Sequence, residues 1–197
     1  MNKKFLVVIL MCLGAFFTAN AQKVGIKTNL LYDLSTTVNL GVEVAVAPQW
    51  TLDISGNLIP WKIGSKSGSW KHTYLQPEAR WWADECFSGH FVGVHALGGV
   101  YELGGLKWMK NVVPGFVDKH PGIAQNRYKG WGVGAGVAYG YAVRLAKHWN
   151  FEAEIGLGYF YFNHDTYEYE GGQQLATGVE RHYVGPTKLG VTFMYLF

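Results

Sequence analysis

The chain has 197 residues, of which 49% are hydrophobic and 16% are charged, and its formal net charge is +3 at pH 7. This small excess of basic residues gives no indication of a nucleic-acid partner, and two cysteines are too few for a disulfide framework or a cysteine-rich metal site. The length suits one domain, and the 26 Gly, 8 Trp, 12 Tyr and 11 Phe are typical of strands with small interior residues and aromatic belts.

Residues 1–21 have the pattern of a cleaved secretory signal. Two lysines precede the apolar run Phe5–Phe17, and Ala19-Asn20-Ala21 is a small-x-small cleavage site. The run is shorter than the roughly 20 residues that a membrane-spanning helix needs. Cys12 lacks the small preceding residue of a lipoprotein signal, so we expect cleavage without lipidation. The mature domain would then be 22–197, with Cys86 as its single cysteine.

Eight later segments alternate between large apolar and small or polar side chains, which is the period of a β-strand. Each is near the roughly 9–11 residues that a tilted strand needs to cross a bilayer. The expected strands are Val24 to about Leu34, Val38–Ala47, Trp50–Leu58, Trp70–Ala83, His90–Leu103, Trp131–Arg144, Phe151–Tyr161 and Leu189–Phe197. In the fifth, Val92, Val94 and Ala96 are expected outside and His95 inside.

The connections between these segments alternate in length. Pro48-Gln49, Asp84–Gly89 and Lys147-His148 are short, whereas 62–69, 104–127 and 163–186 are longer, and only Ser35-Thr36 breaks the rule. Short periplasmic turns and long outer loops are typical of outer-membrane barrels. Tryptophans near the strand ends would form two interfacial girdles, namely Trp50, Trp61, Trp70, Trp81, Trp131 and Trp149.

The closing segment resembles the last strand of such barrels, because its alternation ends on an aromatic residue that a water-soluble domain rarely exposes at a terminus. We therefore expect Phe193, Tyr195 and Phe197 to be read by the barrel-assembly machinery. The predicted fold is all-β, an eight-stranded antiparallel transmembrane β-barrel in the cell outer membrane. The alternative is a secreted lipocalin-like or sandwich protein, whose outer face would be broadly polar.

Several motifs carry a resemblance to a known family. They are Lys27-Thr28-Asn29-Leu30-Leu31-Tyr32-Asp33, Asn39-Leu40-Gly41-Val42-Glu43, Trp50-Thr51-Leu52-Asp53, Trp70-Lys71-His72 and Gln76-Pro77-Glu78-Ala79-Arg80-Trp81-Trp82. The chain resembles, over nearly all of its mature length, the Bacteroidota outer-membrane barrels grouped as the domain of unknown function DUF3575. The resemblance implies fold and location, and it transfers no catalytic residue. Relatives encoded near fimbrial genes suggest a role in surface assembly.

The faces predicted to point inward carry many charges. They are Lys27, Arg80, Arg144 and Lys188 with Glu43, Asp53, Glu78, Glu152 and Glu154. Charges in a low-dielectric interior cost several kcal/mol each unless they pair. An eight-stranded barrel is just wide enough to hold its own side chains. We therefore expect a structural ion-pair network in the lumen, with a narrow gated channel as the alternative.

Enzymatic and metal-binding readings have weaker support. Small outer-membrane barrels include lipid A deacylases and acyltransferases that use Ser or His with an acid. Ser67, Ser69 and His72 are candidates, as are the pairs His164-Asp165 and Glu180 with His182, but none has tight triad spacing. His164 and His182 could also face each other as a metal clip. We predict no catalytic residue, metal or cofactor, and keep a lipid A-modifying enzyme as the alternative function.

The outer connection 104–127 is rich in apolar residues that include Trp108, Val113 and Phe116. An exposed apolar patch often marks a partner site, although the segment could instead fold over the barrel mouth as a lid. The expected function is a non-enzymatic outer-membrane barrel that anchors or displays extracellular loops. Its expected partners are outer-membrane lipid, the assembly machinery and an extracellular or periplasmic protein.

Overall fold

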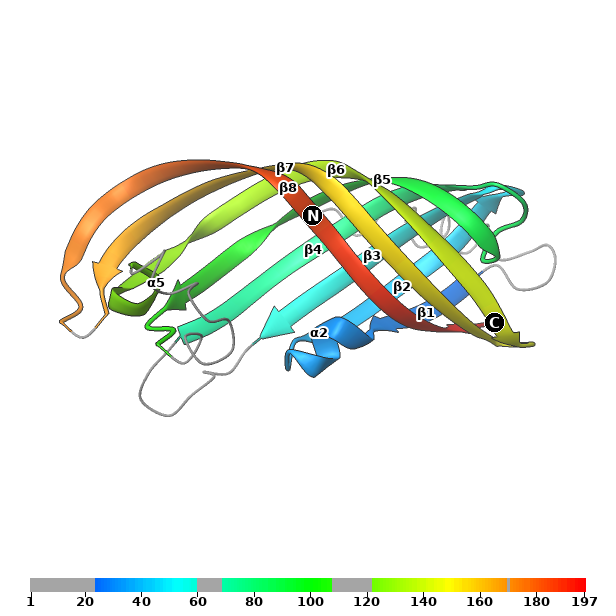
Figure 1. The fold of residues 1–197 in the computed structure, drawn as a ribbon, viewed down its shortest axis with the longest axis horizontal. Helices are drawn as coiled ribbons and strands as arrows, with labels where there is room; N and C mark the ends of the chain where they lie inside the picture. Colours follow the sequence, from blue (N-terminus) through cyan, green and yellow to red (C-terminus); the bar gives the residue numbers. More distant parts are fainter. Residues whose placement is uncertain (1–23, 60–68, 108–121, 170) are drawn as a thin grey trace, which may run out of the picture.

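A computed structural model of the chain describes residues 24–59, 69–107, 122–169 and 171–197, so the expected signal 1–21 lies outside the described residues. Eight antiparallel strands form one closed ring in sequence order (Figure 1). The strands are β1 Val24–Asn29, β2 Val38–Ala47, β3 Trp50–Ile59, β4 Ser69–Trp82, β5 Gly89–Gly104, β6 Asn126–Ala146, β7 Trp149–Glu168 and β8 Gln174–Leu196. Two short helices accompany them, α2 Leu30–Leu34 and α5 Gly122–Gln125.

The ring closes because β1 pairs with β2 on one side and with β8 on the other, where Ile26 lies opposite Tyr195. The tight connections 48–49, 83–88 and 147–148 all lie at one end, which we call the turn end. At the other end, called the loop end, β6, β7 and β8 extend well beyond the rest (Figure 1). No helix among the described residues has the length and apolar character needed to cross a membrane.

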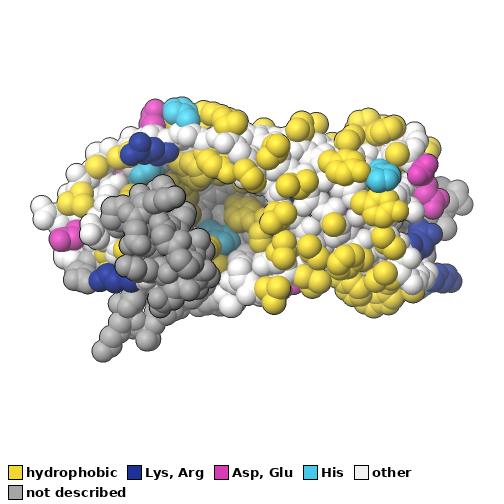
Figure 2. Space-filling view, viewed as in Figure 1, with side chains coloured by type: hydrophobic (Ala, Val, Ile, Leu, Met, Phe, Trp, Pro, Cys, Tyr) yellow, Lys and Arg dark blue, Asp and Glu magenta, His cyan; other side chains and the backbone are white. Residues whose placement is uncertain are grey.

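The two faces of the sheet differ in chemistry. Outward side chains near the middle of the strands are apolar and exposed, among them Leu52, Leu75, Val94, Val137 and Ile155. Figure 2 shows such side chains spread over the middle of one face, with most charged side chains toward the two ends. Inward side chains are largely polar or charged and buried. This distribution is the reverse of that in a water-soluble domain, whose core is apolar.

An apolar layer fills the interior at the turn end. Its main members are Trp82, Phe87, Phe91, Met194 and Leu196, each at most 1% exposed. The Trp82 and Phe91 rings lie 4.7 Å apart between centroids. The 83–88 turn is held beneath this layer, because the Asn150 side chain donates to the Phe87 carbonyl at 2.7 Å. The interior is therefore closed by packed side chains at this end.

The first strand is shorter than predicted, because the backbone turns into α2 at Leu30. Asn29 caps this helix by accepting a hydrogen bond from the Leu31 amide, and the Thr28 hydroxyl bonds Asp33 at 2.7 Å. Asparagine at this position competes effectively with continued strand pairing. Leu30 and Tyr32 therefore belong to α2, although their apolar side chains alternate with others as in a strand.

The predicted outer loop 163–186 is also wrong. β7 continues to Glu168 and β8 starts at Gln174, so the connection is only 169–173. The alternation is lost there because the outward Asn163 and Asp165 of β7 are polar, as are the buried inward His164 and Thr166, and because most of 174–184 in β8 is exposed on both faces. The β7–β8 pairing also shifts register at three places. The predicted contact residues Trp108, Val113 and Phe116 lie outside the described residues.

Candidate functional site

The sequence-predicted charges gather in one buried ion cluster. It consists of Lys27, Arg80 and Lys188 with Glu43, Asp53, Glu78, Glu152 and Glu154. These residues come from β1, β2, β3, β4, β7 and β8, so the cluster spans the lumen from wall to wall. All eight are less than 9% exposed. Residues far apart in sequence meet here only because the ring closes.

Arg80 is the centre of the cluster. Its Nη1 lies 2.7 Å from Glu43 and 3.1 Å from Glu152, and its Nη2 lies 2.9 Å from Glu154. A guanidinium presents its donors in a planar fork, so one arginine can serve several carboxylates at once. Its Cζ also lies 4.5 Å from the centroid of Phe91, which joins the cluster to the apolar layer below.

Two lysines complete the set of cations in the cluster. Lys27 Nζ lies 2.6 Å from Glu43 and 3.1 Å from Asp53. Lys188 pairs with Glu78 and lies 3.3 Å from Glu154. The Thr51 hydroxyl adds a bond to Glu43 at 2.5 Å and accepts one from the Trp82 indole at 3.0 Å. Every cation of the cluster therefore contacts at least two carboxylates.

The prediction for Arg144 was wrong. Its side chain is exposed at the turn end of β6, opposite Asn150 and next to a register shift. Arg144 has the same strand parity as the inward glycines, but it lies past the point where β6 pairs with β5, which ends at Ala142. Alternation predicts the face on which a side chain lies, and it does not predict the level along the strand. The cluster therefore holds three cations and five carboxylates rather than a near-balanced set.

A polar layer lies above the cluster, on the side of the loop end. The β7–β8 register shifts between Gly156 and Leu157, which leaves Thr187 as an extra residue in β8. The Thr187 hydroxyl bonds His95 Nε2 at 2.8 Å, and the Gln76 side chain reaches the Thr187 carbonyl at 3.5 Å. This layer separates the ion cluster from a cavity near the loop end.

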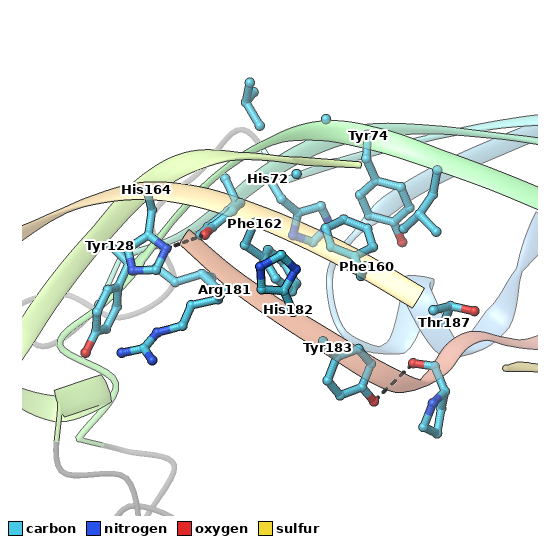
Figure 3. A pocket seen from close by; sticks show the side chains of 18 of the residues that line it. His72, Tyr74, Tyr128, Phe160, Phe162, His164, Arg181, His182, Tyr183 and Thr187 are labelled. Atoms are coloured by element: carbon cyan, nitrogen blue, oxygen red, sulfur yellow. Dashed lines mark hydrogen bonds between the residues drawn. The ribbon is translucent and has the colours of Figure 1, made fainter. Parts of the chain in front are cut away.

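That cavity, the loop-end pocket, has a volume of about 850 Å³. Its walls carry Tyr74 of β4, Leu97 and Tyr101 of β5, and Phe160 and Phe162 of β7 (Figure 3). Thr187 lies at one end of the pocket, and His164, Tyr128 and Arg181 lie toward the other. The volume falls in the range of small-molecule sites, which are mostly apolar with a few polar groups.

Glycines of β6 make room for the pocket aromatics. A Cβ placed on Gly132 or Gly134 would collide with the Phe160 ring, and one on Gly136 would collide with His95 and Thr187. These inward glycines let a narrow ring hold large side chains of the neighbouring strands β5 and β7. The sequence pattern marked the glycines as inward, but nothing in it showed which aromatics they would face.

Among the candidate residues that the structure describes, Ser69 and His72 do not form the pair that the catalytic hypothesis requires. The Ser69 hydroxyl bonds Glu102 at 2.9 Å, whereas His72 accepts a bond from the Trp70 indole, so these hydrogen bonds do not link Ser69 to His72. Ser67 lies outside the described residues. Among the described residues, no group of three or more His, Cys, Asp or Glu is placed to hold a metal ion.

His164 and His182 do not face each other. His164 is buried and lies 3.2 Å from the Tyr101 hydroxyl, while His182 is exposed and bonds the Tyr159 hydroxyl at 2.5 Å. His164 pairs in register with Val179 rather than with His182, so the two imidazoles lie on opposite faces of the hairpin. The hypothesis of a metal clip between them is therefore wrong.

The aromatic residues of the closing strand lie on its outer face at the turn end. Phe193 stacks on Trp149 with centroids 4.8 Å apart, and Tyr195 lies 4.9 Å from Phe197. Trp50 and Trp81 are register partners on neighbouring strands at the same end. At the loop end, Trp131 lies 5.6 Å from Tyr161. Aromatic side chains thus border the apolar middle of the ring at both ends. The predicted girdle residue Trp70 is not among them, because it is half-buried and shares its strand face with His72, to which its indole donates, and with the buried Gln76. Trp61 lies outside the described residues.

Comparison with known proteins supports only the family relationship. No curated protein and no solved structure matches the chain. The profile of the family described as "Protein of unknown function (DUF3575)" matches residues 6–197, essentially the whole sequence, so the chain belongs to this family.

Proposed function

We propose that the protein is a small, non-enzymatic outer-membrane β-barrel that anchors surface-exposed strands and loops. The observation that carries this proposal is the exposed apolar middle of the ring between two aromatic bands. Contiguous apolar surface of this extent is unusual for a protein in water. The ring closes through the pairing of β1 with residues 192–196 of β8, so its paired strands satisfy their backbone hydrogen bonds internally, as lipid requires of a spanning structure. Among the described residues, the part of β8 before residue 192 lacks a partner strand on one side.

The orientation follows from the two ends of the ring. The turn end has connections of two to six residues, whereas β6–β8 project beyond the aromatic band at the loop end. Barrels of this class keep short turns in the periplasm and longer segments outside. The projecting strands and the loop end would therefore be presented at the cell surface. This placement suits contact with an extracellular partner, in line with a role in surface assembly.

The interior argues against a transport pore. The ion cluster spans the lumen, and an apolar layer of five large side chains lies below it. An eight-stranded ring has room for side chains but not for a water channel beside them. We therefore propose a plugged barrel, and a lipid A-modifying enzyme remains only as an outcome of the test.

Membrane fractionation and heat modifiability test the location. The protein should be recovered with the outer membrane, and unheated samples should migrate differently from boiled ones. Purified protein in planar bilayers should give no stable stepwise conductance. Lipid A from a deletion strain, compared by mass spectrometry, should keep its acyl pattern. Recovery in the soluble fraction would contradict the membrane proposal, and a changed acyl pattern would contradict the non-enzymatic one.

A further inference from the structure

Within the described residues, the strand wall of the ring is incomplete beside the loop-end pocket, where α2 packs against β8 but no strand pairs with β8 on that side. β8 pairs with β1 only through residues 192–196, since β1 ends at Asn29. The Asn29 side chain covers the next stretch by bonding the Leu189 carbonyl and the Val191 amide. From Gln174 to Lys188, β8 has no strand on this side within the described ranges. Figure 2 shows a hollow with hydrophobic walls in the corresponding face.

This open edge lies at a defined level of the apolar belt. Residues 182–186 of β8 pair with Tyr161 to Leu157 of β7, on the loop-end side of the belt's middle. Pro186 is part of this edge. Proline has no N–H group, so it adds no unpaired donor at an edge. If the ring spans the outer membrane as proposed, the opening faces the acyl chains of the outer leaflet. The inference below rests on that membrane location.

The pocket has the chemistry of a site for an amphiphile. Its walls are mainly aromatic and aliphatic, and its inner end is closed by Thr187, His95 and Gln76 above the ion cluster. A long chain can therefore enter but cannot pass through to the periplasm. The volume of about 850 Å³ is ample for one extended hydrocarbon chain.

The charged residue that lines the pocket indicates which charge the head group of a bound amphiphile would carry. Arg181 is the one lining residue with a permanent charge, and no Asp or Glu is among the described residues that line the pocket. Arg181 is exposed on β8, level with Phe162, and lies toward the end opposite Thr187. An exposed guanidinium at the rim of an apolar cavity favours a carboxylate or phosphate there.

We propose that the loop-end pocket binds a single long acyl chain with an anionic head group, which enters sideways past the open edge of β8. The chain lies among Tyr74, Leu97, Tyr101, Phe160 and Phe162, and Arg181 pairs with the head group. The same chemistry could come from a free fatty acid or from an acyl chain of an outer-leaflet lipid.

Binding of a fluorescent polyene fatty acid to the protein in nanodiscs of neutral lipid tests this proposal. The unmodified protein should bind it saturably. Arg181→Gln should weaken binding of the acid about tenfold, as for loss of a charge-assisted bond, while leaving the methyl ester unaffected. Arg144→Gln is the matched control at the turn end, and it should change the binding of neither the acid nor the methyl ester. Leu97→Trp, which fills the pocket, should abolish binding, whereas Leu52→Trp on the outer face should not.

Folding and insertion are measured separately by heat modifiability. A folded barrel that does not bind the fatty acid would therefore refute the proposed acyl-chain site and leave the membrane proposal intact. Equal binding by Arg181→Gln, Leu97→Trp and their controls would also overturn it. If Leu97→Trp does not fold, a photoreactive fatty acid on the unmodified protein decides: labels at Leu97, Tyr101 or Phe160 support the site, and labels elsewhere refute it. Native mass spectrometry of membrane-extracted protein distinguishes the source, because a bound free acid and a bound intact lipid differ in mass.

Discussion

Replacing Arg80 by Leu tests whether the ion cluster stabilises the barrel. The substitution removes the cation nearest to Glu152 and Glu154, and Glu152 is left with Lys27 at 3.9 Å as its remaining partner. The cluster would then hold two cations and five carboxylates instead of three cations and five carboxylates. Removing one member of a buried ion pair costs about 3–5 kcal/mol because the remaining charge is uncompensated. With three contacts of 3.1 Å or less lost at once, we expect a value near the top of this range.

Urea unfolding of the protein in lipid vesicles, followed by tryptophan fluorescence, measures this loss. Arg144→Leu is the matched control, because Arg144 is an exposed arginine outside the cluster. Its effect should stay within about 0.5 kcal/mol, as for most surface substitutions. Arg80→Lys should fall between the two, since an ammonium keeps the charge but loses the fork. If Arg80→Leu costs no more than Arg144→Leu, the cluster does not hold the barrel together and the reasoning fails.

Three further measurements address other parts of the chain. Glu152→Gln should change the free energy of unfolding by only about 1 kcal/mol or less, because carboxylates outnumber cations in the cluster; a loss as large as that of Arg80→Leu would contradict this. The Gly178 N–H and the Thr177 hydroxyl donate to Asp165 and hold its pKa below the usual range. The stability that the ionised Asp165 gives this hairpin is present at neutral pH and is lost as the pH falls through the lowered pKa. Asp165→Asn should therefore speed hydrogen exchange at the Gly178 amide at pH 7 but not in strong acid. Burial, together with repulsion from Glu43, raises the pKa of the Cys86 thiol. Alkylation of Cys86 at pH 7 should therefore be slower than that of a free thiol, and it should become faster as the pH rises. Fast labelling at pH 7 would refute this.

Most of the strand order could be predicted from the sequence, because period-two alternation is strong where one face is apolar and the other small or polar. β2 has the predicted bounds, β3 differs by one residue at one end, and β4 and β5 differ by one residue at each end. The errors lie where a local signal competes with alternation. Asn29 caps a helix in place of a continued strand. Beyond Tyr161 both faces of β7 carry polar residues, including the buried His164 and Thr166, so an alternation of apolar and polar residues no longer marks the strand.

The candidate site was only partly accessible to sequence reasoning. Alternation identifies which charges point inward, but the meeting of Arg80 with Glu152 and Glu154 depends on ring closure and on the stagger of strands far apart in sequence. The same limitation misplaced Arg144. The loop-end pocket was missed because it depends on the short β1 and on the extra residue Thr187 in β8. Neither feature leaves a periodic signal, although the Gly185-Pro186 pair hints at an irregular strand.

The central claim is that the apolar middle of the ring faces lipid, and an arginine scan along the outer face of β6 tests it most directly. Val137 lies between Trp131 and Tyr141 on that face, and Leu145 lies on the same face near the turn end; both are exposed. In vesicles, Val137→Arg should lower the free energy of unfolding by about 2–4 kcal/mol, and Leu145→Arg by about 0–1 kcal/mol, because the cost of a charge depends on its depth in the bilayer. Equal, small effects at both positions would mean that Val137 faces water, and the membrane-barrel account would be wrong.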